Sequence, residues 1–132
     1  MALVVPNNGE GDALKYFVNK EAPENLVLRA YTNNLTPAET DNAAAFTEDT
    51  AAGYAFITLV GATWGAPSEG APSSIGYAQQ TWTYTAASSV YGYYMTRATS
   101  GRIALAERFS GAPFVIPGGG GTIKVTPQIT AD

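Results

Sequence analysis

Residues 90–109 read VYGYYMTRATSGRIALAERF and contain the clearest structural signal in the chain. Val90–Thr99 and Arg102–Phe109 are rich in the aromatic and aliphatic residues that are enriched in strands. Ser100 and Gly101, which lie between these two runs, are typical of a tight turn. The sequence therefore predicts an antiparallel β-hairpin over residues 90–109.

Alternation within this hairpin predicts which side chains share a face of the sheet. In its second strand we expect one face to carry Ile103, Leu105, Glu107 and Phe109. In its first strand Tyr91 and Tyr93 would share a face with Met95, and Tyr94 would lie on the other face with Val90 and Gly92. Two aromatic rows cannot both be fully solvated, so at least one of them is expected to be buried in the core or against a partner.

The same two-residue period extends outward from the hairpin. Further strands are predicted at Asn25–Tyr31, Tyr54–Val60, Tyr77–Thr85 and Phe114–Ile116, and a last one through Ile123, Val125 and Ile129. Tyr54–Val60 is apolar on both faces, which is typical of a central strand. Seven or eight strands with loops between them predict an all-β fold, an antiparallel β-sandwich of jelly-roll type. We expect a buried core that includes Leu28, Phe56, Trp82, Ile103, Leu105 and Val125.

The first 24 residues follow a different pattern. Residues 1–9 are predicted to form an extended arm, and Asp12 is positioned to cap a short helix. Leu14, Phe17 and Val18 would form one face of that helix. The predicted organisation is an arm and helix over residues 1–24 and a β-sandwich over residues 25–132, as a single domain. The arm either pairs with an edge strand of its own chain or packs on another subunit.

Composition excludes several classes of function. The 132 residues contain no histidine and no cysteine, which removes the commonest general base, thiolate nucleophiles and the usual transition-metal ligands. Seven Lys and Arg against eleven Asp and Glu give a net charge of -4, which is unfavourable for binding nucleic acid. Only 14% of residues are charged, well below the usual quarter. We therefore expect part of the surface to be covered in an assembly.

No stretch approaches the eighteen continuous apolar residues of a membrane span, and the N-terminus lacks the pattern of a signal peptide. These absences predict a protein that is made in the cytoplasm and does not enter a membrane.

Three patterns that resemble ligand sites have simpler explanations. Gly118–Gly121 leads into a predicted strand rather than a helix, which favours a flexible connection over a phosphate cradle. The acidic residues of the 39–49 loop match no calcium-binding spacing, which favours a solvated loop. Glu107 has several arginines near it in sequence, which favours an ion pair over a catalytic carboxylate. We predict no enzymatic activity, no cofactor and no metal.

The strand tyrosines leave two interpretations open. An exposed aromatic strip could stack on sugars or anchor a protein interface, whereas buried rings would form core and cross-strand pairs. Candidate interface residues are Leu3, Val4 and Val5 in the arm, with Tyr91 and Tyr93 in the hairpin.

Several segments of the chain resemble a known class of proteins. They are residues 3–10 (LVVPNNGE), 22–29 (APENLVLR), 32–34 (TNN), 90–94 (VYGYY), 106–109 (AERF), 113–116 (PFVI) and 123–127 (IKVTP). Together they resemble small virion structural proteins of tailed bacteriophages, and among these the head decoration (cement) proteins. The likeness runs nearly end to end and contains no catalytic signature.

This resemblance implies a non-enzymatic protein of the virion, assembled in the host cytoplasm. It implies a decoration protein that stabilises the phage head by bridging capsid subunits, often as a dimer or trimer. The implied partners are the major capsid protein or other virion proteins, without nucleic acid or membrane. Two alternatives remain open at this stage: a tail, neck or fibre-associated virion protein, and a carbohydrate-binding β-sandwich module. No site residues carry over from the resemblance.

Overall fold

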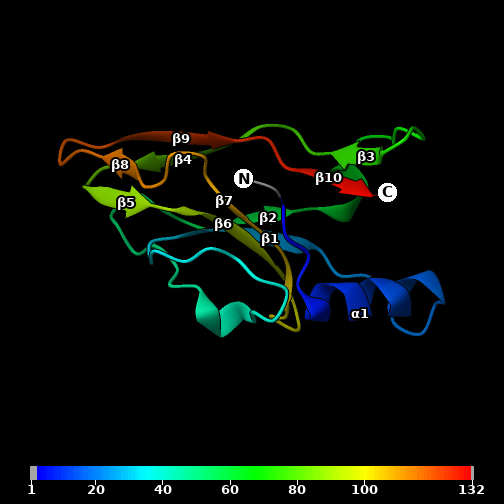
Figure 1. Cartoon of the computed structure of the whole chain (residues 1–132). Coiled ribbons are helices and arrows are strands. Elements are labelled where there is room, and N and C mark those ends of the chain that lie inside the picture. Colours follow the sequence, from blue (N-terminus) through cyan, green and yellow to red (C-terminus); the bar gives the residue numbers. More distant parts are fainter. Residues whose placement is uncertain (1–2, 132) are drawn as a thin grey trace.

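The structure is a computed structural model that describes residues 3–131. Within this range it contains ten strands, all in antiparallel pairings, and one α-helix, so the prediction of a mostly β fold is confirmed (Figure 1). The elements are α1 (Asn7–Phe17), β1 (Leu26–Tyr31), β2 (Ile57–Leu59), β3 (Ser73–Gly76), β4 (Gln80–Tyr84), β5 (Ser88–Val90), β6 (Gly92–Arg97), β7 (Ile103–Arg108), β8 (Phe114–Ile116), β9 (Gly121–Val125) and β10 (Gln128–Ala131). Short 3-10 turns occur at Ala43–Ala45 and Gly61–Thr63.

A four-stranded sheet in the order β2-β1-β6-β7 forms the centre of the molecule. The pairs β4-β9, β5-β8 and β10-β3 complete the β structure, and Figure 1 shows β4 and β9 in a layer above the four-stranded sheet. The hairpin predicted over residues 90–109 is confirmed, because β6 and β7 pair with Tyr93 opposite Glu107. Gly101 adopts a φ of +68° in the connecting turn, a conformation that glycine reaches without strain.

The main core cluster lies between the four-stranded sheet and the layer above it. Its buried members come from eight strands and include Leu28, Leu59, Trp82, Val90, Tyr93, Met95, Leu105, Ile116, Ile123 and Val125. Five of the six predicted core residues are buried, and Phe56 is the exception, with more than half of its surface exposed. Phe56 precedes β2, and the Arg29 guanidinium lies over its ring. The prediction of a central strand at Tyr54–Val60 is wrong, since β2 is short and lies at the sheet edge.

A second buried cluster occupies the opposite face of the same sheet. It consists of Tyr31, Phe46, Tyr94, Ile103 and Ala106. Phe46 comes from the long 32–52 loop and stacks on Tyr94 with ring centroids 4.7 Å apart. All six residues of β6 are buried, because the loop covers Tyr94 on the face that the upper layer does not reach and Arg97 lies against α1.

Two predicted face assignments are wrong for the same kind of reason. Ile103 belongs to the second cluster and Leu105 to the main one, and the pairing register shifts between Met95 and Thr96. Tyr91 lies against the second cluster rather than beside Tyr93, because it occupies the break between β5 and β6. A bulge or break changes the phase of alternation, which a fixed two-residue period does not represent.

The N-terminal arm pairs with its own chain. Val4 donates to the Ala106 carbonyl at 2.8 Å and accepts from the Ala106 amide at 2.9 Å, which adds a bridge at the free edge of β7. Leu3 and Val5 pack against the main core cluster. Of the two expectations for the arm, the structure has the pairing within the chain; Met1 and Ala2 lie outside the described residues.

Candidate interaction site

Helix α1 buries its polar side and exposes its apolar side. Gly9 and Asp12 are its buried residues, whereas Leu14, Phe17 and Val18 are 68%, 89% and 68% exposed. An ordinary surface helix of a monomer has the opposite arrangement. The expectation that Asp12 caps the helix is wrong, because the helix begins at Asn7 and Asp12 lies inside it.

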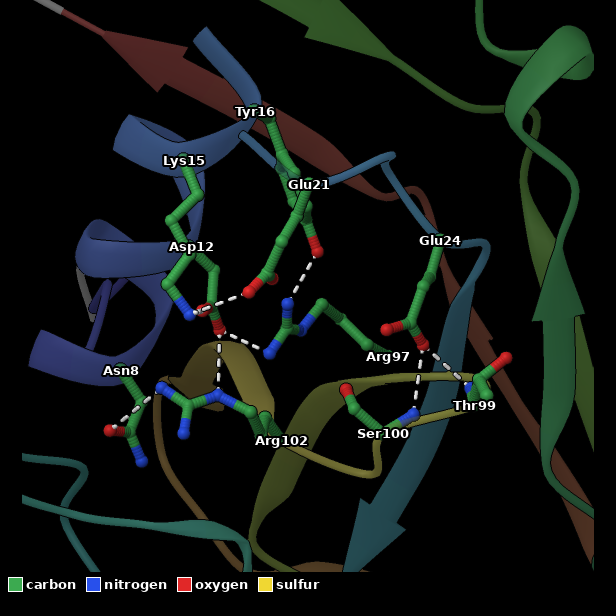
Figure 2. A network of polar contacts seen from close by, with 10 residues as sticks. All are labelled: Asn8, Asp12, Lys15, Tyr16, Glu21, Glu24, Arg97, Thr99, Ser100 and Arg102. Atoms are coloured by element: carbon green, nitrogen blue, oxygen red, sulfur yellow. Dashed lines mark hydrogen bonds and ion pairs between the residues drawn. The ribbon is translucent and has the colours of Figure 1, made fainter. Parts of the chain in front are cut away.

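Asp12 holds the helix on the sheet through a cluster of charges (Figure 2). Its carboxylate pairs with Arg97 at the end of β6, and with Arg102 Nε at 2.9 Å. Lys15 Nζ lies 3.4 Å from its other oxygen. Asp12 and Arg97 are 2% and 3% exposed, so this ion pair is shielded from water. Burial by itself raises the pKa of the Asp12 carboxyl, but the Arg102 hydrogen bond and the charges of Arg97 and Arg102 outweigh it, and the pKa is lowered.

Further contacts make the attachment of α1 close and specific. The Arg97 guanidinium also donates to the Tyr16 hydroxyl, and it lies 5.7 Å from the centre of that ring. Gly9 faces the backbone of β7, where an added Cβ would lie 2.3 Å from the Ala104 carbonyl oxygen. Only glycine permits this close approach of the two backbones. The orientation of α1 on the sheet is therefore fixed by two contacts, the ion pairs of Asp12 and the approach of Gly9 to β7.

The exposed side of α1 borders two hollows. One, of about 650 Å³, is lined by Glu10, Leu14, Phe17 and three smaller apolar residues: Val5, Ala13 and Ala131. The other, of about 330 Å³, lies between α1, β7 and β10 and shares Val5, Ala13 and Ala131 with the first. An apolar ridge therefore stands directly beside an apolar recess. We use the name α1 surface for the exposed side of α1 together with the residues that line these two hollows.

A second apolar surface is formed by β8. Phe114 and Val115 are 49% and 65% exposed, and β8 pairs only with β5 in its sheet within the described residues. Figure 1 shows β8 at the opposite end of the molecule from α1. The described residues thus expose large apolar side chains at each end of the molecule, and also at Phe56 and Val60 beside β2.

The predicted interface residues lie in three different environments. Leu3, Val4 and Val5 are half-buried in the arm, and Val5 reaches the α1 surface. Tyr91 is partly exposed, with the Arg108 guanidinium over its ring. Tyr93 is only 4% exposed and belongs to the main core.

The predicted ion pair of Glu107 is wrong, because its carboxylate accepts a hydrogen bond of 2.5 Å from the Tyr93 hydroxyl. Burial, together with the Glu107 charge, raises the pKa of Tyr93 above its ordinary value. Glu107 thus accepts a hydrogen bond from a tyrosine of the main core.

Two acidic residues of the 39–49 loop, Glu48 and Asp49, make structural contacts within the chain. Glu48 pairs with Arg29 at 2.7 Å, and buried Asp49 accepts from the Ser88 hydroxyl at 2.6 Å. Within residues 3–131 no group of three or more His, Cys, Asp or Glu side chains is arranged to hold a metal ion. The same range contains no helix long and apolar enough to cross a membrane.

The sequence contained a signal for the α1 surface that the predictions did not use fully. The apolar spacing of Leu14, Phe17 and Val18 marked a helix face, but it did not show whether that face lies on the core. The small and polar residues on the other side, Gly9 and Asp12, were the sign that this other side is the attached one. The arginines that bind Asp12 are far away in sequence, so no local pattern contained them.

No protein-family model, curated protein or solved structure matches this chain.

Proposed function

We propose that this protein is a virion structural protein, a decoration protein that stabilises a tailed-phage head by bridging capsid subunits. We further propose that its strands form a jelly-roll-like β-sandwich. The observation that carries the proposal is the pair of apolar surfaces at opposite ends of the molecule, at α1 and at β8. A bridging protein needs two contact surfaces that can be occupied at the same time.

The construction of the domain supports this function. Exposed apolar patches on soluble proteins commonly mark contact sites, and here they are the outer faces of attached elements. The Asp12 cluster and the close approach at Gly9 fix α1 to the sheet. A force that acts on the outer face of α1 would therefore be transmitted to the whole domain. The low charge content is also consistent with surfaces that are covered in an assembly.

A carbohydrate-binding function has less support. A sugar platform needs several exposed aromatic rings in one plane, whereas four of the rings on the predicted strands, Trp82, Tyr84, Tyr93 and Tyr94, are buried. A tail or neck location has no structural observation of its own and enters as an outcome of the test.

The test is to locate the protein on particles of the virus whose genome encodes it, by immunogold electron microscopy. Labelling over the head supports decoration. Labelling confined to the tail or neck would replace it with the tail-associated role, and particles without label would contradict both.

A matched set of variants then tests the bridging surfaces. Val115→Asp introduces a charge at the β8 end, and Ser110→Asp introduces the same charge at an exposed polar position nearby. We expect Val115→Asp to reduce binding to heads at least tenfold and Ser110→Asp to leave it unchanged. Equal binding by both variants would remove β8 from the contact.

A further inference from the structure

We propose that the α1 surface is the docking site for a second copy of this chain, related by a two-fold axis that crosses the middle of α1. The inference rests on the proposed function, because it names the partner at one of the two surfaces. It assigns α1 to the sister subunit and leaves β8 for the capsid.

The first reason is that the α1 surface is complementary to itself in shape. Phe17 is the most exposed large apolar side chain of the described residues, and the recess of about 650 Å³ lies beside it. In a two-fold contact each surface meets its own copy, so a residue of one subunit contacts a second residue of the other and the reverse contact also forms. Such an axis lets Phe17 of each copy enter the recess of the other, against Val5 and Ala131.

The second reason is that the charges at the ends of this surface are complementary in the same arrangement. Glu10 lies in the first turn of α1, and Lys20 lies just beyond the other end of the helix, after the turn at Asn19. Both are exposed, and neither forms an ion pair within residues 3–131. When two copies of α1 run antiparallel, Glu10 of each lies near Lys20 of the other. Both pairs are opposite in charge, whereas a parallel arrangement would set like charges together.

The charge of Lys15 does not oppose this contact. Its ammonium group is already paired with Asp12 and with Glu21, at 3.4 and 3.1 Å. Lys15 thus lies on the side of α1 that carries buried Asp12, and the exposed apolar residues Leu14 and Phe17 determine the contact at the axis. Rim charges of this kind chiefly govern which partner binds and in which orientation.

The first experiment measures mass in solution by sizing chromatography with light scattering. The wild-type chain is expected at twice the mass of one chain, and Phe17→Ser at the mass of one chain. Val115→Ser is the matched control, since it removes a comparably exposed apolar side chain at the β8 end and should leave the dimer intact. A wild-type chain of single mass, or a Phe17→Ser variant of unchanged mass, would overturn the inference.

The second experiment uses charge reversal, which tests the antiparallel geometry directly. Glu10→Lys sets lysine against lysine at both ends of the contact, and Lys20→Glu sets glutamate against glutamate. Each variant alone should dimerise about tenfold more weakly, which corresponds to about 1.4 kcal/mol. An equimolar mixture of the two should recover wild-type affinity, because each variant then faces its complement.

Recovery in the mixture cannot come from a merely structural role of either residue, since neither variant regains its own side chain. Weak dimerisation that the mixture fails to restore would exclude the antiparallel arrangement and overturn the inference. Unchanged circular dichroism of all variants, whose substituted residues are exposed, confirms that the fold is intact.

The same variants distinguish failure of the dimer from failure of the decoration role. If Phe17→Ser keeps the wild-type mass but no longer labels heads, the capsid occupies α1, so the inference fails and the decoration role stands. If the chain dimerises as expected but never labels particles, the inference stands and the decoration role fails.

Discussion

Asp12 is the residue on which the position of α1 most depends. Its buried carboxylate meets two arginines and a lysine, and no other carboxylate contacts Arg97 within the described residues. Removal of one member of a buried ion pair leaves the other without compensation, which commonly costs about 3–5 kcal/mol.

We therefore expect Asp12→Asn to lower the free energy of unfolding by about 3–5 kcal/mol, as measured by urea denaturation. Glu69→Gln is the control, because Glu69 lies in an exposed loop, and its effect should stay within about 0.5 kcal/mol. Equal stabilities for the two variants would contradict the role given to Asp12.

The pH dependence of stability provides a second test of the same residue. The folded-state pKa of Asp12 is lowered from its ordinary value of 3.8, so ionised Asp12 stabilises the fold above that value. This contribution is lost as the pH falls from about 4 through the lowered pKa. The difference in melting temperature between wild type and Asp12→Asn should thus shrink steadily below about pH 4. A difference that stays constant down to strong acid would show that the charge of Asp12 is not what stabilises the helix contact.

Gly92 illustrates how tightly the central strands pack. An added Cβ there would lie 2.1 Å from the Glu107 carbonyl oxygen and 2.7 Å from the Tyr31 hydroxyl. Gly92→Ala should destabilise the fold by about 1–3 kcal/mol, since backbone and a buried ring must move. Gly118→Ala is the control, because nothing lies within 4 Å of its added Cβ, and it should be neutral or slightly stabilising. Thermal unfolding of the two variants distinguishes these expectations.

At the level of elements, the arm acts as a short extra strand on the four-stranded sheet. It forms two backbone hydrogen bonds with Ala106, and Leu3 and Val5 cover part of the core. Deletion of residues 1–5 should lower stability by about 2–4 kcal/mol, from the lost hydrogen bonds and the uncovered apolar surface. A truncated chain that melts like the wild type, in differential scanning calorimetry, would mean that this pairing contributes nothing to the fold.

The elements that could be predicted from the sequence were those whose information is local. The hairpin over residues 90–109 has a turn and two adjacent strands, and it was predicted correctly. Tyr54–Val60 has the composition of a central strand, but its place at the sheet edge depends on which strand pairs with it. The bulge near Thr96 likewise arises from pairing across the hairpin, so alternation alone assigned Ile103 to the wrong face.

The candidate site could be predicted only in part for the same reason. Periodicity correctly identified a helix with Leu14 and Phe17 on one face, whereas Val18 is the residue that follows its end. Which face turns outward is decided by Arg97 and Arg102, which reach Asp12 from a hairpin that follows some ninety residues later. A periodic pattern records that a face is apolar, whereas its exposure depends on the rest of the molecule.

At the scale of the whole molecule, both faces of the four-stranded sheet are covered within the chain. The upper strands cover one face, and the 32–52 loop covers the other by inserting Phe46 between Tyr31 and Tyr94. The loop is therefore part of the core, although its sequence resembles a surface connection. This arrangement leaves three places where large apolar side chains lie at the surface: α1 and β8 at the two ends, and Phe56 with Val60 beside β2.

Five tyrosines in or against the two core clusters have raised pKa values, so the stability of the fold is expected to fall at alkaline pH. Burial raises the pKa of Tyr31 and of Tyr94 to about 12, and it raises those of Tyr54, Tyr84 and Tyr93 further. A raised folded-state pKa stabilises the fold fully below the ordinary value of 10, and this contribution is lost as the pH rises through the folded-state value.

Five of the eight tyrosines should therefore resist ionisation near pH 10 and ionise together only when the core opens, above about pH 11. The measurement is a titration of tyrosinate ultraviolet absorbance, followed in parallel with near-ultraviolet circular dichroism. Because the phenolate forms of these rings cannot remain in an apolar core, the absorbance step and the loss of dichroism should coincide. Ionisation of these five rings near pH 10 with the dichroism intact would mean that water reaches both clusters. In that case the core that holds α1 and β8 in place would be packed less tightly than the structure shows.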